Sequence, residues 1–284
     1  VQSSNEVLLT SYAGQPQTKT TIAGNKIDGF TANWAADDAI GVYTTAGTAN
    51  AKHTITVLSD GTAKFTGKVA ASENEQTLYA YYPYTSSATS NLAAALLNLP
   101  SVQTMTGASY DASAAIMVGK PQAATVNGET SEIGNWKFAH LGSYISISVA
   151  GITAETVSTD ELVSTVSIKS ESKTLSGDFT LKLENGQVAF SKTSDEVNVT
   201  VPEGTTLGNL AAWAVTAPFA LADESLTITI VTNRNTISKT VKLTKEFKAG
   251  NVYTLGINID ENCAVKKALA FAKEYSVSER TCYW

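Results

Sequence analysis

Two adjacent aspartates, Asp37 and Asp38, precede an apolar run in the segment ANWAADDAIGVYTT, residues 32–45. Paired carboxylates can act as general acid and base, or can supply oxygen ligands to Ca²⁺. An acid–base pair needs carboxylates that converge from different elements, whereas neighbours that enter a strand point to opposite faces. A calcium site needs further oxygen ligands at alternate positions, which this segment lacks. We therefore predict a turn that starts a strand, with Trp34 and Ile40 pointing inward.

The remaining residue types that carry chemistry are few. Neither of the two histidines, His53 and His140, has a His, Cys or carboxylate nearby at metal-ligand spacing, so each is predicted to be structural. A nucleophilic cysteine would have to be Cys263 or Cys282, both close to the C-terminus. No serine-hydrolase, P-loop, zinc-protease or dinucleotide motif occurs. The sequence predicts no enzyme, no metal site and no cofactor.

The elements that position these residues are predicted to be short β-strands. Residues 52–67, KHTITVLSDGTAKFTG, alternate apolar with polar and turn at Asp60-Gly61, which is typical of a hairpin. The segment LENGQVAF predicts a second hairpin, with positive φ angles at Asn185-Gly186 in a tight primed turn. Similar segments rich in Val, Ile, Thr and aromatics recur roughly every 8 to 12 residues. This pattern favours antiparallel β-sandwiches over an α/β fold.

Two segments read differently from the strands. SNLAAALLNLP, residues 90–100, has Ser90 as an N-cap and Pro100 as a stop, which predicts a short helix or an ordered loop. CAVKKALAFAKEY, residues 263–275, places apolar residues at helical spacing. The chain is therefore expected to end in a partly helical extension.

Length and composition indicate a folded protein of two domains. The 284 residues exceed one ordinary domain, and 43% hydrophobic with 16% charged residues supplies enough apolar area for two cores. No stretch reaches the roughly 18 consecutive apolar residues of a membrane helix. The net charge of −6 and the scattered lysines exclude nucleic acid as the expected partner.

Cysteine usage fits an exported protein, because neither presumed core contains a thiol. The first residues, VQSSNEVLLTSY, lack the basic and apolar regions of an export signal. We expect any such signal to have been cleaved or omitted.

Five further segments have recognisable patterns in a fixed order: KTTIAGNKIDGFTANWAADDAIGVYTT (19–45), LYAYYPYTSS (78–87), LPSVQTMTGASYDASAAIMVGKP (99–121), WKFAHLGSYISISV (136–149) and FKAGNVYTLGINI (247–259). Together they resemble the fimbrillin family, also called Mfa-like or major fimbrial subunit proteins, of Gram-negative anaerobes from gut and mouth. In that family a T-[RK]-T segment is followed by a tryptophan and then by an acidic GD-x-I-G-V entry to a strand. Ala36 stands here where the family usually has Gly, and the resemblance covers roughly residues 18–260.

The resemblance implies an all-β fold with two tandem transthyretin-like Greek-key β-sandwiches. The N-terminal domain would span residues 1–126, with its first strand at 6–12, and the C-terminal domain would span 127–260. Residues 261–284 would form the short extension. The polar, glycine-containing segment 124–135 supports a connector at this boundary.

The resemblance further implies a structural subunit of a type V pilus, exported as a lipoprotein to the outer membrane and cell surface. Such subunits polymerise with other pilus subunits by strand exchange and support adhesion, and they contact the membrane only through a lipid anchor on the precursor. Removing a strand exposes an apolar groove and unpaired backbone groups, which a strand of the next subunit can fill. The strand expected to leave is EVLLTSY, with Val7, Leu8 and Leu9.

Family maturation cuts after a basic residue. The only arginines are Arg234 and Arg280, so the expected processing site is Lys19, an ordinary surface lysine being the alternative. A C-terminal extension donates the strand in stalk subunits of the family, but residues 261–284 alternate only loosely.

The two cysteines of the chain can pair within the C-terminal extension. A Cys263–Cys282 disulfide would close a loop of about 20 residues and contribute on the order of 3 kcal/mol to the free energy of unfolding, two unpaired cysteines being the alternative.

The alternative function is a glycan-binding or otherwise adhesive surface lipoprotein of the same fold that does not polymerise. Its aromatic platform could come from Trp213, Tyr283 or Trp284, although Trp213 is expected in the core.

Overall fold

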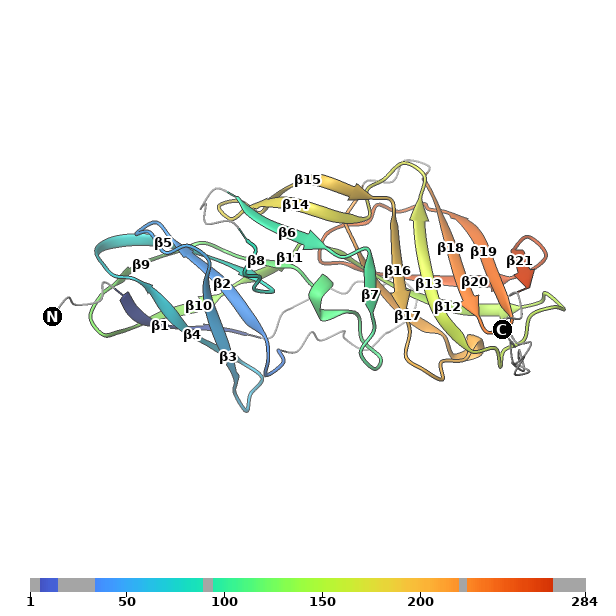
Figure 1. Ribbon diagram of the computed structural model, residues 1–284, viewed down its shortest axis with the longest axis horizontal. Coiled ribbons are helices and arrows are strands. Elements are labelled where there is room, and N and C mark those ends of the chain that lie inside the picture. Colours follow the sequence, from blue (N-terminus) through green and yellow to red (C-terminus); the bar gives the residue numbers. More distant parts are fainter. Residues whose placement is uncertain (1–5, 15–33, 89–93, 220–223, 268–284) are drawn as a thin grey trace, which may run out of the picture.

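Alternating apolar and polar residues form β-strands throughout the described part of the chain. The computed structural model describes residues 6–14, 34–88, 94–219 and 224–267. Within them the only helical elements are two single-turn 3₁₀ helices, η1 (Ala112–Ala114) and η2 (Leu207–Asn209). The molecule is elongated, with a β-sheet lobe at each end (Figure 1). The predicted all-β fold is confirmed.

Nine strands form the N-terminal sheet, in the order β10-β1-β4-β3-β2-β5-β8-β11, with β9 also paired to β5. The hairpin predicted at Asp60-Gly61 joins β3 to β4, and Gly61 adopts a φ of 80° in its turn. The strands are β1 (Glu6–Ala13), β2 (Ala39–Thr44), β3 (Ala51–Val57), β4 (Ala63–Ala70), β5 (Ser72–Tyr82), β8 (Met117–Gly119), β9 (Gln122–Val126), β10 (Thr130–Trp136) and β11 (Phe138–His140).

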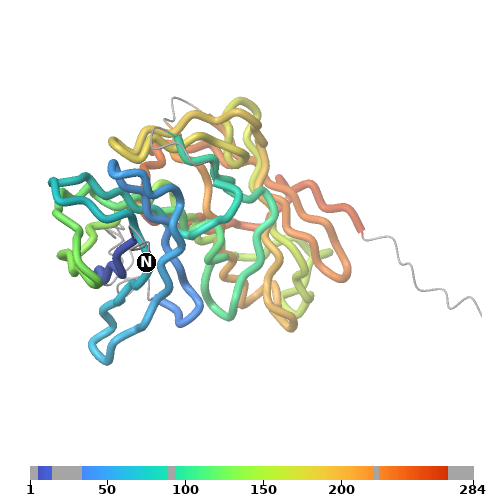
Figure 2. The backbone as a smooth tube through the Cα atoms, turned by 60° about the vertical axis from the view of Figure 1, so that its left-hand side comes forward, coloured from blue at the N-terminus to red at the C-terminus, as the bar shows by residue number. Residues whose placement is uncertain are grey.

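Three further sheets form the rest of the molecule, in the orders β17-β12-β20, β21-β19-β18-β13-β16-β7 and β15-β14-β6. Both views place β6, β14 and β15 above the junction of the two lobes (Figures 1 and 2). The strands are β6 (Ala95–Leu99), β7 (Val102–Thr104), β12 (Ser143–Ile152), β13 (Val163–Ser170), β14 (Ser176–Lys182), β15 (Gln187–Ser194), β16 (Glu196–Thr200), β17 (Ala211–Thr216), β18 (Ser225–Thr232), β19 (Asn235–Lys242), β20 (Val252–Ile259) and β21 (Ala264–Lys267).

Strands that are far apart in the sequence pair with one another across the two lobes and within the first lobe. The β6–β7 segment pairs with β14 and β16 of the later sequence, whereas β10 returns to pair with β1. The expectation of a polar connector at residues 124–135 is wrong, because β9 and β10 occupy most of that segment. The division of the chain at residue 126 stays a prediction, and the strand pairing crosses it.

Three local predictions fail where longer-range contacts decide the structure. Residues 95–99 form β6 rather than a helix, because they pair with β14. Residues 264–267 form β21 rather than the start of a helix, because they pair with β19. The β14–β15 hairpin exists, but its connection has four residues, and of the Asn185-Gly186 pair only Gly186 has positive φ.

Both histidines lie in the interior of the protein. His53 is fully buried on β3, and His140 is 6% exposed, with its Nδ1 2.6 Å from the Tyr144 hydroxyl. Burial lowers the pKa of His53 to about 4 and the pKa of His140 to about 4, because an apolar interior disfavours the charged imidazolium. Both rings are therefore neutral in the folded protein at neutral pH.

The side chain of Gln103 joins two sheets. It is fully buried on β7, and its Nε2 donates to the carbonyl of Val215 (2.7 Å) while its Oε1 accepts from the Val215 N–H (2.9 Å). The Trp213 N–H on the same side of β17 donates to Met105 Sδ at 3.4 Å. Side chains from the first half of the chain thus satisfy the backbone along this edge of β17.

A Gln103→Leu substitution should lower the free energy of unfolding by about 2–4 kcal/mol, because it leaves the N–H and C=O of Val215 buried without partners. Urea unfolding measures this loss. The matched control is Gln187→Leu, at an exposed position on β15. Equal midpoints for the two variants would contradict the role of Gln103.

Acid should destabilise the protein through the histidines. An unfolded histidine has a pKa near 6.5, so between about pH 6.5 and 4 the unfolded chain binds protons that the folded chain does not. Stability should therefore fall by about 2 kcal/mol per histidine as the pH falls from about 7.5 to 5.

The measurement is urea unfolding at several pH values. His53→Leu should remove about half of this loss, and Lys52→Leu, an exposed site on the same strand, should leave it unchanged. A His53→Leu variant with the wild-type pH dependence would show that His53 is not the source.

Candidate assembly site at strand β1

The Asp37-Asp38 segment is a turn, as predicted. Asp38 Oδ2 accepts from the Ala35 N–H (2.7 Å), and the Tyr82 hydroxyl donates to Asp38 Oδ1 (2.7 Å). Burial, together with this hydrogen bond and the nearby carboxylate charge, raises the pKa of Tyr82 far above its usual value. Both oxygens of Asp38 therefore serve the structure of the turn.

The turn holds Trp34 at the end of strand β1. The Trp34 ring is 6% exposed and packs edge-on against Phe65, Tyr82 and Phe138, with centroid distances of 5.1, 5.4 and 5.7 Å. Its Nε1 donates to the carbonyl of Gly14, directly after β1, at 3.0 Å. The two described ends that flank residues 15–33 are therefore joined by a hydrogen bond.

Strand β1 is paired along both of its edges. It runs antiparallel to β4 from Glu6 to Ala13 and parallel to β10, where the Leu8 N–H donates to the Glu129 carbonyl at 3.1 Å. The sheet order therefore places β1 between these two strands, with β10 at the edge of the sheet. The strand predicted at residues 6–12 is thus confirmed, and it lies inside the sheet.

The side chains of β1 alternate between core and solvent. Val7 and Leu9 are fully buried, whereas Leu8, between them, is 41% exposed. Burial of Val7 and Leu9 stabilises the fold by about 1.5–3 kcal/mol per side chain. The strand therefore contributes an apolar face and two rows of backbone hydrogen bonds.

The core beneath β1 is shaped to fit it. Gly67 of β4 pairs with Leu9, and a Cβ at position 67 would lie 2.3 Å from His53 Cδ2. The His53 ring thus occupies the space that a side chain at position 67 would need. Any larger residue there would displace this ring from the core that β1 covers.

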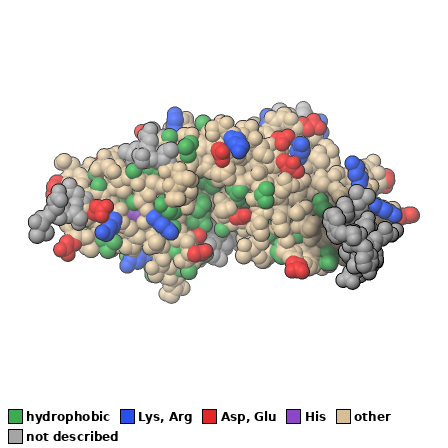
Figure 3. Space-filling view, in the orientation of Figure 1, with side chains coloured by type: hydrophobic (Ala, Val, Ile, Leu, Met, Phe, Trp, Pro, Cys, Tyr) green, Lys and Arg blue, Asp and Glu red, His purple; other side chains and the backbone are tan. Residues whose placement is uncertain are grey.

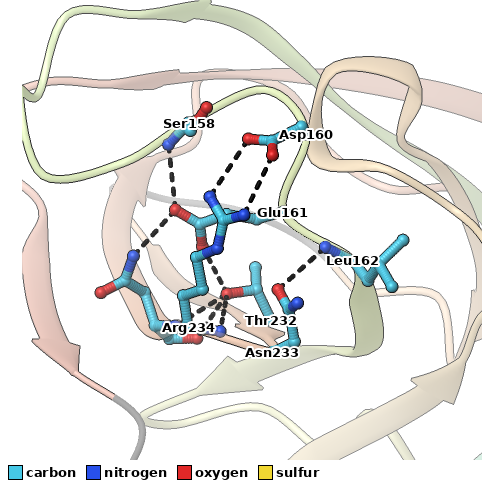
Figure 4. Close-up of polar contacts among 8 residues, drawn as sticks. Ser158, Asp160, Glu161, Leu162, Thr232, Asn233 and Arg234 are labelled. Atoms are coloured by element: carbon cyan, nitrogen blue, oxygen red, sulfur yellow. Dashed lines mark hydrogen bonds and ion pairs between the residues drawn. The ribbon is translucent and has the colours of Figure 1, made fainter.

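Glu161 is the buried carboxylate that most resembles a catalytic group, and it is fully hydrogen-bonded (Figure 4). Its Oε1 accepts from the Ser158 N–H (2.9 Å) and Asn235 Nδ2 (2.8 Å), and its Oε2 accepts from the Thr232 hydroxyl. These bonds tie the β12–β13 connection to the β18–β19 turn. Glu161 is therefore a structural residue.

Metal-ligating and charged side chains are dispersed over the described residues (Figure 3). They contain no group of three or more His, Cys, Asp or Glu side chains that could hold a metal ion. Lysine, arginine and acidic side chains are interspersed over the face in Figure 3 rather than gathered by sign. Among the described residues, no helix is long and apolar enough to cross a membrane.

Several predicted site residues lie outside the described part of the chain, namely Lys19, Cys282, Tyr283 and Trp284. Cys263 is partly buried just before β21, and its disulfide with Cys282 stays a prediction. Trp213 is 8% exposed in the core, as expected, so it offers no exposed platform.

The comparisons with solved structures show the fold. A candidate cell adhesion protein from Bacteroides uniformis matches with a TM-score of 0.60 at 16% identity, over 93% of this chain and 96% of the other. A second candidate cell adhesion protein, from Bacteroides fragilis, matches with a TM-score of 0.56 at 12% identity, over 95% and 100% of the two chains. No match is found among curated proteins.

A family comparison agrees with the segments that carried the resemblance. The model of the fimbrillin-like family matches residues 19–271, which include most of the described strands. The chain belongs to the fimbrillin-like family.

Proposed function

We propose that this protein is a structural subunit of a cell-surface fimbria that supports adhesion and assembles with other subunits by strand exchange at β1. The main observation behind this proposal is the position of β1 in the sheet. This N-terminal strand buries an apolar face and is hydrogen-bonded along both edges. Family membership and the fold shared with candidate adhesion proteins support the same function. No cofactor or catalytic step enters this account.

Strand exchange follows from how β1 is attached. Only the chain through residues 15–33 connects β1 covalently to the rest of the described fold. A cut within this segment would leave β1 held by hydrogen bonds and apolar contacts alone. A strand of similar alternation from another subunit could then replace it, forming the same bonds with β4 and β10.

We place the cut after Lys19 or a lysine close by. Gly14 and Trp34 lie on opposite sides of such a cut, so their hydrogen bond would survive it. The nicked strand should therefore stay in place until an incoming strand displaces it. This order would keep the apolar core covered at every stage.

The first residues of the C-terminal extension pair with a strand of the same chain. Residues Ala264–Lys267 form β21 and pair with β19, so this part is already engaged. A strand donated by the extension would have to lie beyond Lys267. We further propose export to the cell surface, with a lipid anchor on the precursor.

Limited trypsin digestion tests the processing site. We expect loss of the covalent link between β1 and the rest of the chain by a cut after Lys19 or Lys26, followed by a ladder of oligomers on size-exclusion chromatography. A Lys19→Gln/Lys26→Gln variant should stay monomeric under the same digestion. Nicked protein that remains monomeric would favour the alternative, a surface adhesin that does not polymerise.

Mass spectrometry of fimbriae from native cells gives an independent check. Assembled subunits should lack the segment up to about Lys19. An intact segment in assembled subunits would contradict proteolytic activation, even if strand exchange occurs by another route.

A matched pair of substitutions tests how β1 is held. Leu9→Asp puts a charge into the fully buried face and should cost about 3–5 kcal/mol, releasing β1 from the nicked protein. Leu8→Asp changes the neighbouring exposed side chain and should cost less than about 1 kcal/mol. Hydrogen exchange of the β4 amides and urea unfolding measure both effects, and equal effects would contradict the orientation of β1, with Leu9 buried and Leu8 exposed.

A further inference from the structure

A cleft of about 710 Å³ lies where the N-terminal sheet meets the small sheet β15-β14-β6. One wall follows the end of β5 and the residues after it, and the other follows β6 with neighbouring positions of β14 and β15. Its volume is in the range of pockets that bind small organic ligands. The cleft is separate from β1 and from the strands that pair with β1.

The cleft runs along the edge of β6. Three consecutive residues, Leu96, Leu97 and Asn98, line it, although alternate residues of a strand point to opposite faces. In the part of the chain that the structure describes, β6 pairs with β14 on one side and ends its sheet on the other. Leu96 is 44% exposed there, so the wall has an accessible apolar surface.

A preorganised polar pair lies on the same wall. Asn98 Nδ2 donates to Asp178 Oδ1 at 2.6 Å, from strands that are neighbours in the sheet although 80 residues separate the two positions. This bond fixes both side chains and leaves a second amide hydrogen, the Asn98 carbonyl oxygen and Asp178 Oδ2 for a ligand. Ser113 and Ser191 add hydroxyl groups to the lining.

The opposite wall is aromatic. Tyr84 lines the cleft beside Pro83, and the Lys52 ammonium lies 5.6 Å from the centroid of the Tyr84 ring. This cation–π contact restrains a partly exposed ring. The site therefore combines an aromatic surface with a fixed set of hydrogen-bond donors and acceptors.

We propose that this cleft binds a neutral oligosaccharide. The described lining residues include one carboxylate, Asp178, and no lysine, arginine or histidine; the Lys52 ammonium lies beside them in its contact with the Tyr84 ring. This lining disfavours phosphorylated, sulfated or carboxylated ligands. Sugar hydroxyls can donate to the Asp178 carboxylate and accept from the Asn98 amide, while the C–H face of the ring packs on Tyr84. The inference rests on the proposed adhesive role and not on strand exchange.

Glycan-array screening of the full chain with neutral and acidic oligosaccharides, followed by titration calorimetry with the best neutral one, tests the proposal. Tyr84→Ala and the near-isosteric Asp178→Asn should each weaken binding by about tenfold to a hundredfold. The matched controls are Tyr79→Ala, on β5, and Asp195→Asn, in an exposed ion pair with Lys169; neither residue lines the cleft. Both controls should bind as the wild type does.

Three results would overturn the proposal: binding of no neutral glycan, binding of acidic glycans only, or neutral-glycan binding that both cleft variants leave unchanged. Capture of an extended apolar peptide at the β6 edge, without glycan binding, would also overturn it. Thermal unfolding of each variant separates loss of fold from loss of binding. Because Asp178 lies away from β1, Asp178→Asn should still form oligomers after trypsin digestion, so the failure of one proposal is distinguishable from that of the other.

Discussion

The pairing of β1 between β4 and β10 is the interaction on which the N-terminal lobe depends. It joins two strands that would otherwise present open edges, and it places Val7 and Leu9 over the core. Without β1, backbone groups on two strands and the apolar surface around Phe65 would be exposed together. The lobe therefore needs a strand in this position, but the geometry does not require that the strand belong to the same chain.

The contacts that join the two lobes do not depend on β1. The first half of the chain sends β6 and β7 into sheets formed by the second half, and Gln103 bonds to the backbone of β17 from within the core. The buried carboxylate Glu161 fixes the distant end of the second lobe through its own set of bonds. These contacts involve neither β1 nor its neighbours, so the proposed replacement of β1 would leave the junction of the lobes intact.

Local chemistry explains what the sequence could predict. Alternation identified most strands, the family resemblance supplied β1, and the turn-forming aspartates identified the start of β2. Sequence-based prediction failed at residues 95–99, where alanine and leucine favour a helix but pairing with β14 selects a strand. The predicted turn type failed at Asn185, where the length of the loop sets the turn. The parallel β1–β10 pair and the Asn98–Asp178 contact join residues far apart in sequence, and no local pattern encodes such contacts.

A reversible lock on β1 tests the central claim most directly. Thr10 and Thr66 are directly paired across β1 and β4, so Thr10→Cys/Thr66→Cys can form a cross-strand disulfide. After trypsin digestion, the oxidised variant should remain monomeric, and reduction should release its assembly into oligomers, while the single Thr66→Cys variant assembles under both conditions. Equal assembly of the oxidised and reduced forms would show that β1 does not leave its position, and would contradict strand exchange at this site.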